Sequence, residues 1–335
     1  MNKCWQLSAT SLLAALSLSV NADTLSNVQA KGSLSCGVST GLVGFSSADS
    51  AGNWKGLDVD ICRAVAAATL GDANKVKFVP LTAKERFTAL QSGEIDILSR
   101  NTTWTLTRDG SLGLNFAGIN YYDGQGFMVK KSLGVTRAKE LDGATFCIQA
   151  GTTTELSLAD YFRSNDMSFK TLAVDTSAQS KNGFEADRCD ALTSDQSQLY
   201  ALRTTLKDPS SAIILEDIIS KEPLGPVVRQ GDDQWFNIVK WSLNAMITAE
   251  ELGVNSHNVH TNFKNPEIAR LLGQSGKLNE YLGLEKKWGF NIISQVGNYA
   301  QSFERNIGTS TPLNIDRGQN ALWIDGGLLY SPPFR

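Results

Sequence analysis

The sequence predicts an α/β protein of two lobes, with a hinge of two chain segments that cross between them. Three observations support this fold class. Short apolar runs alternate with amphipathic stretches over residues 33–228, which is the pattern of strands and helices in α/β units. The alternation falls into two series that are separated near Gly126. The last third of the chain is mainly helical, and helices without their own sheet need an existing surface to cover.

The first series reads as a βαβαβ unit. Its predicted strands are 33–38, 76–80 and 95–99, and its predicted helices are 58–70 and 84–91. This order of elements packs as a parallel sheet with helices on its faces. The first series therefore predicts the sheet of one lobe.

The second series predicts another α/β unit. Its predicted strands are 127–129, 145–149, 170–174, 191–193, 212–215 and 227–228, and its helices are 152–162, 178–186 and 196–206. Later helices are predicted at 235–251, 266–272 and 292–307, followed by an irregular tail over 309–335.

The simplest topology divides the chain into three parts after a leader. Residues 23–126 begin the first lobe, residues 127–228 form the second lobe, and residues 229–335 return to complete the first. Two crossings between lobes make a hinge, and a crevice between two such lobes is a common ligand site. We therefore expect a ligand to bind between the lobes.

Residues 1–22 have the features of a secretory signal peptide. Lys3 supplies a positive charge, an apolar run extends from Leu12 to Val20, and Ala22 suits a signal peptidase. No later segment reaches the ~20 continuous apolar residues that span a bilayer. We expect the mature protein to start at Asp23 and to be periplasmic, with no direct membrane insertion.

The cysteines predict two disulfides. Cys4 lies in the leader, which leaves Cys36, Cys62, Cys147 and Cys189. An even number of cysteines in an oxidising compartment favours disulfides, and buried free thiols are the alternative. Four cysteines permit three pairings, but nearness in sequence favours Cys36 with Cys62 and Cys147 with Cys189.

Composition argues against several classes of function. The chain has 31 basic and 34 acidic residues, a formal net charge of −3 and no long basic run. We therefore expect neither nucleic acid nor anionic lipid as a partner. His257 and His260 have no carboxylate or cysteine cluster near them in sequence, so we expect neither a metal nor a cofactor.

A pattern of hydrolases occurs at Gly37-Val-Ser-Thr-Gly41. In hydrolases the G-x-S-x-G turn runs directly into a helix, whereas the residues that follow Gly41 are rich in glycine and serine. We infer a loop that lines a cleft, not a nucleophilic Ser39. Phe45 in this loop offers either an apolar face to a ligand or a side chain for the core.

The densest cluster of hydroxyl and amide groups follows the predicted strand 95–99. Arg108 can hold both oxygens of a carboxylate, while Asn101 and Thr103 form hydrogen bonds from the side. The alternative is a capped turn in which Arg108 pairs with a surface acid. This loop is a candidate carboxylate site.

The second series offers two complementary features. Thr153 lies where a predicted helix begins, so free backbone N–H groups surround it. Asp195 follows the predicted strand 191–193, and clefts form at the carboxyl ends of strands. Either residue could instead serve as a helix cap. Together with Arg108, they complement the two charges of an α-amino acid.

Several motifs, in one order, resemble the signatures of family 3 extracellular solute-binding proteins. They are Gly56-Leu-Asp-Val-Asp-Ile-Cys-Arg-Ala64, Phe87-Thr-Ala-Leu-Gln-Ser-Gly-Glu-Ile-Asp-Ile97, Asn115-Phe116 to Gly126, Leu141-Asp-Gly143 and Gly151-Thr-Thr-Thr-Glu155. The resemblance extends to about Leu252. Ser99-Arg-Asn-Thr-Thr-Trp-Thr105, the long C-terminal extension and the cysteine placement are most similar to the general L-amino-acid-binding proteins of this family.

The resemblance implies a clamp of the periplasmic-binding-protein-like type II fold. It implies that Arg108 binds the ligand α-carboxylate with Asn101 and Thr103, that Thr153 assists from the second lobe, that Asp195 binds the α-ammonium and that Phe45 lines the side-chain pocket. Receptors for acidic amino acids in this family carry an arginine at the position of Ser39. Its absence argues against strict selectivity for glutamate or aspartate, although Arg100 could supply a charge instead.

These features predict the substrate-binding component of an amino-acid ABC importer. We expect a monomer without catalytic activity that closes on free L-amino acids of several kinds and presents its closed form to a membrane permease. The alternative is an enzyme on the same fold, since the family resembles periplasmic cyclohexadienyl dehydratases, with Asp195 as the general acid.

Overall fold

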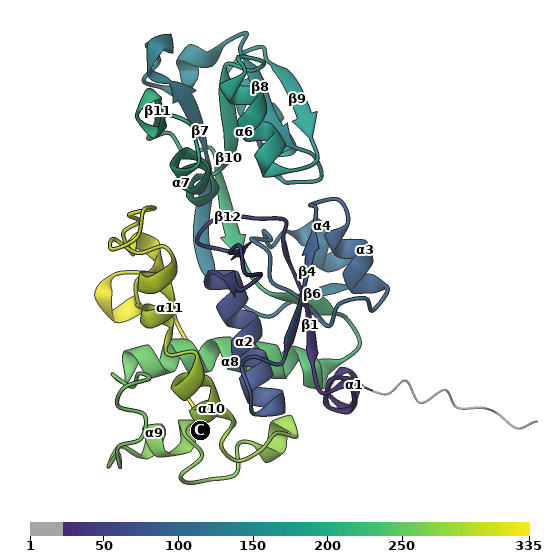
Figure 1. Cartoon of the computed structure of the whole chain (residues 1–335), viewed down its shortest axis with the longest axis vertical. Helices are drawn as coiled ribbons and strands as arrows, with labels where there is room; N and C mark the ends of the chain where they lie inside the picture. The colour runs from purple at the N-terminus through teal and green to yellow at the C-terminus, as the bar shows by residue number, and fades with distance from the viewer. Residues whose placement is uncertain (1–22) are drawn as a thin grey trace, which may run out of the picture.

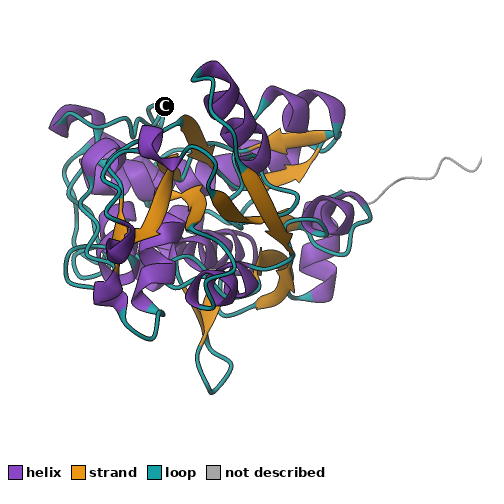
Figure 2. Ribbon diagram, turned by 90° about the horizontal axis from the view of Figure 1, so that it is seen from above, coloured by secondary structure: helices purple, strands orange, loops and turns teal. Residues whose placement is uncertain are grey.

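The computed structural model describes residues 23–335, so the predicted signal peptide and Cys4 lie outside the described residues. The chain forms two lobes, one above the other in Figure 1, and each lobe contains its own β-sheet. Seen from above, helices flank the strands (Figure 2). The predicted two-lobed α/β fold class is confirmed. Among residues 23–335, no helix combines the length and apolar character needed to cross a membrane.

The lower lobe in Figure 1 contains a sheet of strand order β4-β1-β5-β13-β6. Its strands are β1 (Leu34–Ser39), β4 (Val76–Leu81), β5 (Ile97–Leu98), β6 (Leu114–Phe116) and β13 (Val227–Arg229). β1 runs parallel to β4 and β5, whereas β13 is antiparallel to β5 and β6. Two short strands, β2 (Ser47–Ala48) and β3 (Trp54–Lys55), form a separate hairpin.

Helices of the lower lobe come from both ends of the chain. The first group is α1 (Thr24–Lys31), α2 (Leu57–Leu70), α3 (Arg86–Gln91) and α4 (Leu106–Ser111). The second group is α8 (Asp233–Glu251), α9 (Pro266–Leu271), α10 (Trp288–Gln295) and α11 (Tyr299–Asn306). The chain therefore returns to the first lobe after building the second.

The upper lobe contains a sheet of strand order β11-β7-β10-β8-β9. Its strands are β7 (Tyr121–Lys130), β8 (Thr145–Gln149), β9 (Lys170–Val174), β10 (Ala191–Asp195) and β11 (Ala212–Ile214), and its helices are α5 (Thr154–Ser164), α6 (Ser177–Glu185) and α7 (Gln196–Thr204). β8 is parallel to β9 and β10, and β7 is antiparallel to β10.

Two strands connect the lobes (Figure 1). The first half of β7 pairs with β12 (Ser220–Leu224), and its second half pairs with β10 and β11. The crossing segments are therefore an antiparallel ladder and not two loops. The expected boundary after residue 126 falls inside β7, and the expected boundary after residue 228 falls inside β13. The division of the chain at these residues stays a prediction.

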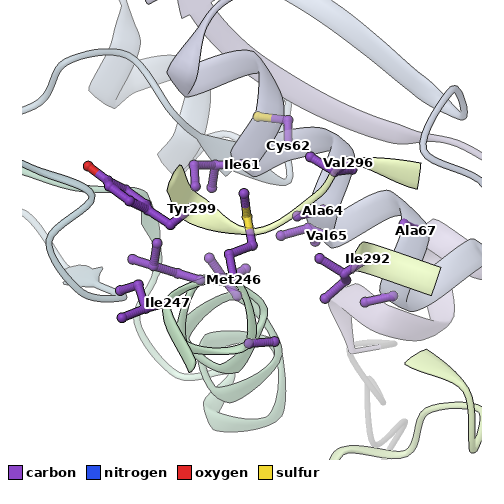
Figure 3. Close-up of a cluster of buried hydrophobic side chains, with 14 of the residues drawn as sticks. Ile61, Cys62, Ala64, Val65, Ala67, Met246, Ile247, Ile292, Val296 and Tyr299 are labelled. Carbon is purple, nitrogen blue, oxygen red and sulfur yellow. The ribbon is translucent and has the colours of Figure 1, made fainter. Parts of the chain in front are cut away.

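The core of the first lobe lies where the returning helices cover α2. Small and branched side chains of α2 meet residues of α8 and α10 in Figure 3, where the labels include Ile61, Ala64, Val65, Ala67, Met246, Ile247 and Ile292. All of these side chains are buried. Burial of apolar area stabilises the folded state by about 25 cal/mol per Å². This contact therefore holds the C-terminal helices α8 and α10 against the rest of the first lobe.

The single helix predicted over 292–307 is wrong. α10 ends at Gln295 and α11 starts at Tyr299. Gly297 between them has φ +93°, a conformation that interrupts a helix and that glycine adopts without strain. Asn298 then caps α11 by accepting a hydrogen bond from the Gln301 backbone N–H at 2.9 Å, which fixes the start of the new helix.

The C-terminal extension contacts the strand that joins the lobes. The Asn320 side chain accepts a hydrogen bond from the Tyr122 N–H (2.7 Å) and donates one to the Tyr122 carbonyl (3.0 Å). The Tyr122 hydroxyl donates to the Leu328 carbonyl at 3.2 Å. The predicted irregular tail thus lies along β7 and extends beyond the returning helices.

Both predicted disulfides are confirmed. Cys36 of β1 bonds to Cys62 of α2, and Cys147 of β8 bonds to Cys189, which is separated from the start of β10 by one residue. Each disulfide joins a pair of elements within one lobe. Neither spans the connection between the lobes.

Replacing Cys147 and Cys189 together with Ala should lower the free energy of unfolding by about 3 to 4 kcal/mol. The bond closes a segment with a sequence separation of 42, which restricts the unfolded chain. Urea unfolding of the variant and the wild type measures the difference. Free thiols in non-reducing peptide maps of the wild type would contradict the pairing.

Candidate ligand-binding site

A small cavity of about 10 Å³ lies between the lobes and is lined by polar and charged residues. The first lobe contributes Arg86, Arg100, Asn101, Thr103 and Arg108, and the second contributes Gln149, Thr152, Thr153, Thr154, Ser194, Asp195 and Gln198. Of the predicted ligand-binding residues, the structure brings together Asn101, Thr103, Arg108, Thr153 and Asp195.

The position of Arg108 is set by the N-terminal cap of α4. The Thr105 hydroxyl accepts a hydrogen bond from the Arg108 backbone N–H at 3.3 Å and so starts α4. The guanidinium donates to the Thr103 carbonyl at 2.8 Å and lies over the Phe87 ring. Among the described residues, no carboxylate forms an ion pair with Arg108. The capped turn exists, but the surface ion pair of the alternative interpretation does not.

Asn101 adopts a left-handed backbone conformation, with φ 31°, which asparagine tolerates better than most residues. Its N–H donates to Asp58 (2.7 Å), and its side-chain NH₂ donates to Gln198 of α7 (3.1 Å). Its Oδ1 atom is buried and has no hydrogen-bond partner within residues 23–335. In this arrangement Asn101 offers an acceptor, whereas the sequence predicted that it would assist a carboxylate.

Glu222 was not predicted from the sequence. Its Oε2 atom accepts hydrogen bonds from Thr103 of the first lobe (2.6 Å) and Thr153 of the second (2.8 Å). Both hydroxyl hydrogens are thus directed at Glu222, and the hydroxyl oxygens remain as acceptors. Glu222 lies on β12, whose sequence Ser-Lys-Glu-Pro-Leu is polar and contains Pro223. Such a segment lacks the apolar pattern of a strand.

Asp195 ends β10, where the sequence placed it. It occupies the N-cap position of α7 but makes no capping hydrogen bond with its side chain, so the carboxylate is available to a ligand. Burial raises the pKa of Asp195 well above its ordinary value, and the nearby carboxylates Asp123 and Glu222 raise it further. A cation beside Asp195 would offset both effects.

Ser39 and Phe45 do not line this cavity. Phe45 is buried in the core and packs edge-on against Tyr121 at 5.4 Å between ring centroids; core packing is the alternative that the sequence left open. Ser39 is buried, and its N–H donates to the Ser46 hydroxyl at 3.0 Å. No α-helix follows β1 directly, because β2 and β3 come next. A ligand contact by either residue stays a prediction.

A polar cavity between two α/β lobes, with a guanidinium from one and a carboxylate from the other, defines a two-lobed ligand-binding protein. Residues 34–256 match the bacterial extracellular solute-binding proteins, family 3. The chain belongs to this family, as its motifs indicated.

Comparison with known proteins gives the same class. The chain is 57% identical over 333 residues to the putative amino-acid ABC transporter-binding protein YhdW of Escherichia coli K12, with 98% of each chain covered. It is 56% identical over 328 residues to the general L-amino acid-binding periplasmic protein AapJ of Rhizobium johnstonii, with 97% and 96% covered.

A solved periplasmic binding protein from Brucella ovis, with glutathione bound, superimposes with a TM-score of 0.92. It is 55% identical and covers 94% of this chain and 100% of its own. The family and these relatives are solute-binding proteins and not enzymes, which favours binding over the dehydratase alternative.

Proposed function

We propose that this protein is the periplasmic substrate-binding component of an amino-acid ABC importer, and that it binds free L-amino acids of several kinds between its lobes. The observation that carries this proposal is the presence of Arg108 and Asp195, from opposite lobes, on one cavity. A guanidinium and a carboxylate match the two charges that every α-amino acid carries. The names of the relatives agree with this ligand class.

The cavity gives the ligand an orientation. Arg108 binds the α-carboxylate, because its planar guanidinium can donate to both oxygens. Asp195 binds the α-ammonium, with the Asn101 Oδ1 atom and the hydroxyl oxygens of Thr103 and Thr153 as further acceptors. A ligand held in this way contacts both lobes and bridges them.

Contacts between the lobes support a clamp mechanism. Asn101 bonds to Gln198 (3.1 Å), Arg86 donates to the Gly151 carbonyl (3.3 Å), and Lys84 pairs with Asp175 (2.7 Å). The exposed pair of Lys84 and Asp175 contributes little, and a ligand that bridges the lobes adds contacts that only the closed form makes, so it favours that form. The closed monomer, exported after removal of residues 1–22, would then be recognised by a membrane permease.

A thermal-shift panel tests the ligand class. Several L-amino acids, including uncharged ones, should raise the melting temperature, because a ligand at 100 times its dissociation constant stabilises the folded state by about 2.7 kcal/mol. D-amino acids and sugars serve as controls, and glutathione is included because the Brucella ovis protein holds it. Stabilisation by glutathione, glutamate or sugars alone would contradict the proposal. Mass spectrometry of the natively purified protein would identify any retained ligand.

A further inference from the structure

A second, larger cavity lies on the other side of the strands that connect the lobes. It has a volume of about 470 Å³, and within residues 23–335 it shares no lining residue with the ligand cavity. Its walls are β7, β12, helix α7 of the second lobe and residues 314–320 of the C-terminal extension, which comprises residues 309–335. In Figure 1, α11 and the chain that follows it lie to the left of the connecting strands, whereas α3 and α4 lie to the right. The C-terminal extension therefore faces the second lobe on the side away from the ligand.

The C-terminal extension is attached firmly to the first lobe. Arg317 pairs with Glu250 of α8 at 2.8 Å, and its guanidinium lies over the rings of Tyr299 and Phe303 of α11. Four apolar side chains of the extension are buried at 3% exposure or less: Leu313, Leu322, Leu329 and Phe334. Because buried apolar contacts and a partly buried ion pair hold it, the extension moves with the first lobe as one body.

One buried side chain ties the extension to the connecting ladder. Asn320 forms hydrogen bonds with both the N–H and the carbonyl of Tyr122 on β7 (2.7 and 3.0 Å). These two backbone groups point away from β12, where the residue in register with Tyr122 is Pro223, which has no N–H to donate. The Asn320 amide thus takes the place of a strand partner at this edge of β7. It fixes the extension next to the axis about which the lobes can move.

A gap separates the extension from the second lobe. Among the described residues, no hydrogen bond or ion pair joins residues 309–335 to α7. The ladder of β7 and β12 lies between the two cavities, so a rotation that widens the ligand cavity narrows this gap. In the closed form the ligand side has a free volume of about 10 Å³ and the opposite side about 470 Å³. Opening of the lobes therefore moves α7 towards residues 314–320.

We propose that the C-terminal extension is a stop that limits how far the two lobes open. When α7 meets residues 314–320, further rotation is blocked, and the ligand-free protein stays near the closed form. A larger population close to the closed form raises the apparent affinity for any ligand that the closed form binds. The family match ends at residue 256, so the stop is an addition to the two-lobed clamp.

Filling the gap tests the stop in one direction. Gln319→Trp places a bulky side chain on the cavity wall, so the ligand-free lobes should open less and L-glutamate should bind about threefold more tightly. Pulsed EPR measures the opening as the distance between nitroxide labels on cysteines introduced at Thr88 of α3 and Asn182 of α6, both of which are exposed. Gln274→Trp is the matched control, because Gln274 is exposed and lines neither cavity. A ligand-free distance equal to that of the wild type would overturn the proposal.

Releasing the tie tests the stop in the opposite direction. Asn320→Ala should lengthen the ligand-free distance, leave the ligand-bound distance unchanged and weaken L-glutamate binding about threefold. Asn298→Ala is the matched control: Asn298 is also buried, accepts a hydrogen bond from the Gln301 N–H (2.9 Å) and donates one to the Val254 carbonyl (2.8 Å). Both variants should melt at lower temperature, but only Asn320→Ala should change the distance. If the two variants have the same ligand-free distance, Asn320 stabilises the fold without limiting the opening, and the proposal is wrong.

Discussion

Replacing Asp195 with Asn should weaken amino-acid binding by a factor of hundreds or more. The variant keeps the shape of the side chain but removes the charge that faces the ligand ammonium. Loss of one partner from a buried charge pair costs about 3 to 5 kcal/mol, and about 1.4 kcal/mol corresponds to a tenfold change in affinity. Calorimetric titration of the folded variant with the preferred amino acid measures the loss.

The pH dependence of binding provides an independent readout for Asp195. In the empty protein its pKa is raised by burial and by Asp123 and Glu222, whereas a bound ammonium favours the ionised form. Binding should therefore release protons, and the affinity of the wild type should fall as the pH is lowered. The Asn variant should lose the part of this dependence that arises from residue 195.

Asp160→Asn is the matched control for this prediction. Asp160 lies on the exposed face of α5 in the same lobe, 3.9 Å from Arg163, and removal of such a surface ion pair changes a free energy by about 1 kcal/mol at most. Near-native affinity of the Asp195 variant would exclude Asp195 from the site.

Arg108→Lys should reduce affinity about 100-fold, although it keeps the positive charge. A lysine ammonium cannot donate two parallel hydrogen bonds to one carboxylate, and hydrogen bonds to charged groups contribute about 1.5 to 3 kcal/mol. The variant also loses the planar group that lies over the Phe87 ring. Titration with alanine as well as glutamate shows whether the loss concerns the α-carboxylate, which both ligands share.

Arg163→Lys, an exposed substitution on α5, should leave the affinity for both ligands unchanged. If Arg108→Lys resembles this control, or loses glutamate binding while alanine binding persists, then Arg108 does not hold the α-carboxylate.

Periodicity predicted the regular elements well where the local sequence determines them. The strand predicted over 145–149 and the one predicted over 170–174 coincide with β8 and β9. The break between α10 and α11 depends on one glycine in a left-handed conformation, Gly297, which the apolar pattern conceals. β12 was missed because it is polar, and its pairing with β7 comes from the distant chain.

The residues of the candidate site likewise fall into those that the sequence indicated and those that it did not. Arg108 and Asp195 follow strands or begin helices, so their position along the chain indicated a cleft. Arg86 is the first residue of α3, but the predicted helix over 84–91 placed it inside a helix, so the sequence did not indicate that its side chain reaches the cavity. For Phe45 the sequence left both a ligand contact and core packing open, and the structure places its side chain in the core beside Tyr121.

The ladder between β7 and β12 also determines how much chain freedom the protein loses when it binds. Residues from Tyr121 to Gln125 pair in register with residues from Leu224 to Ser220, so the backbone of both crossing segments is already ordered. Fixing one residue of a flexible linker costs about 1 to 2 kcal/mol of conformational entropy. A motion that twists this ladder avoids that loss, and more of the interaction energy between ligand and cavity is retained as affinity.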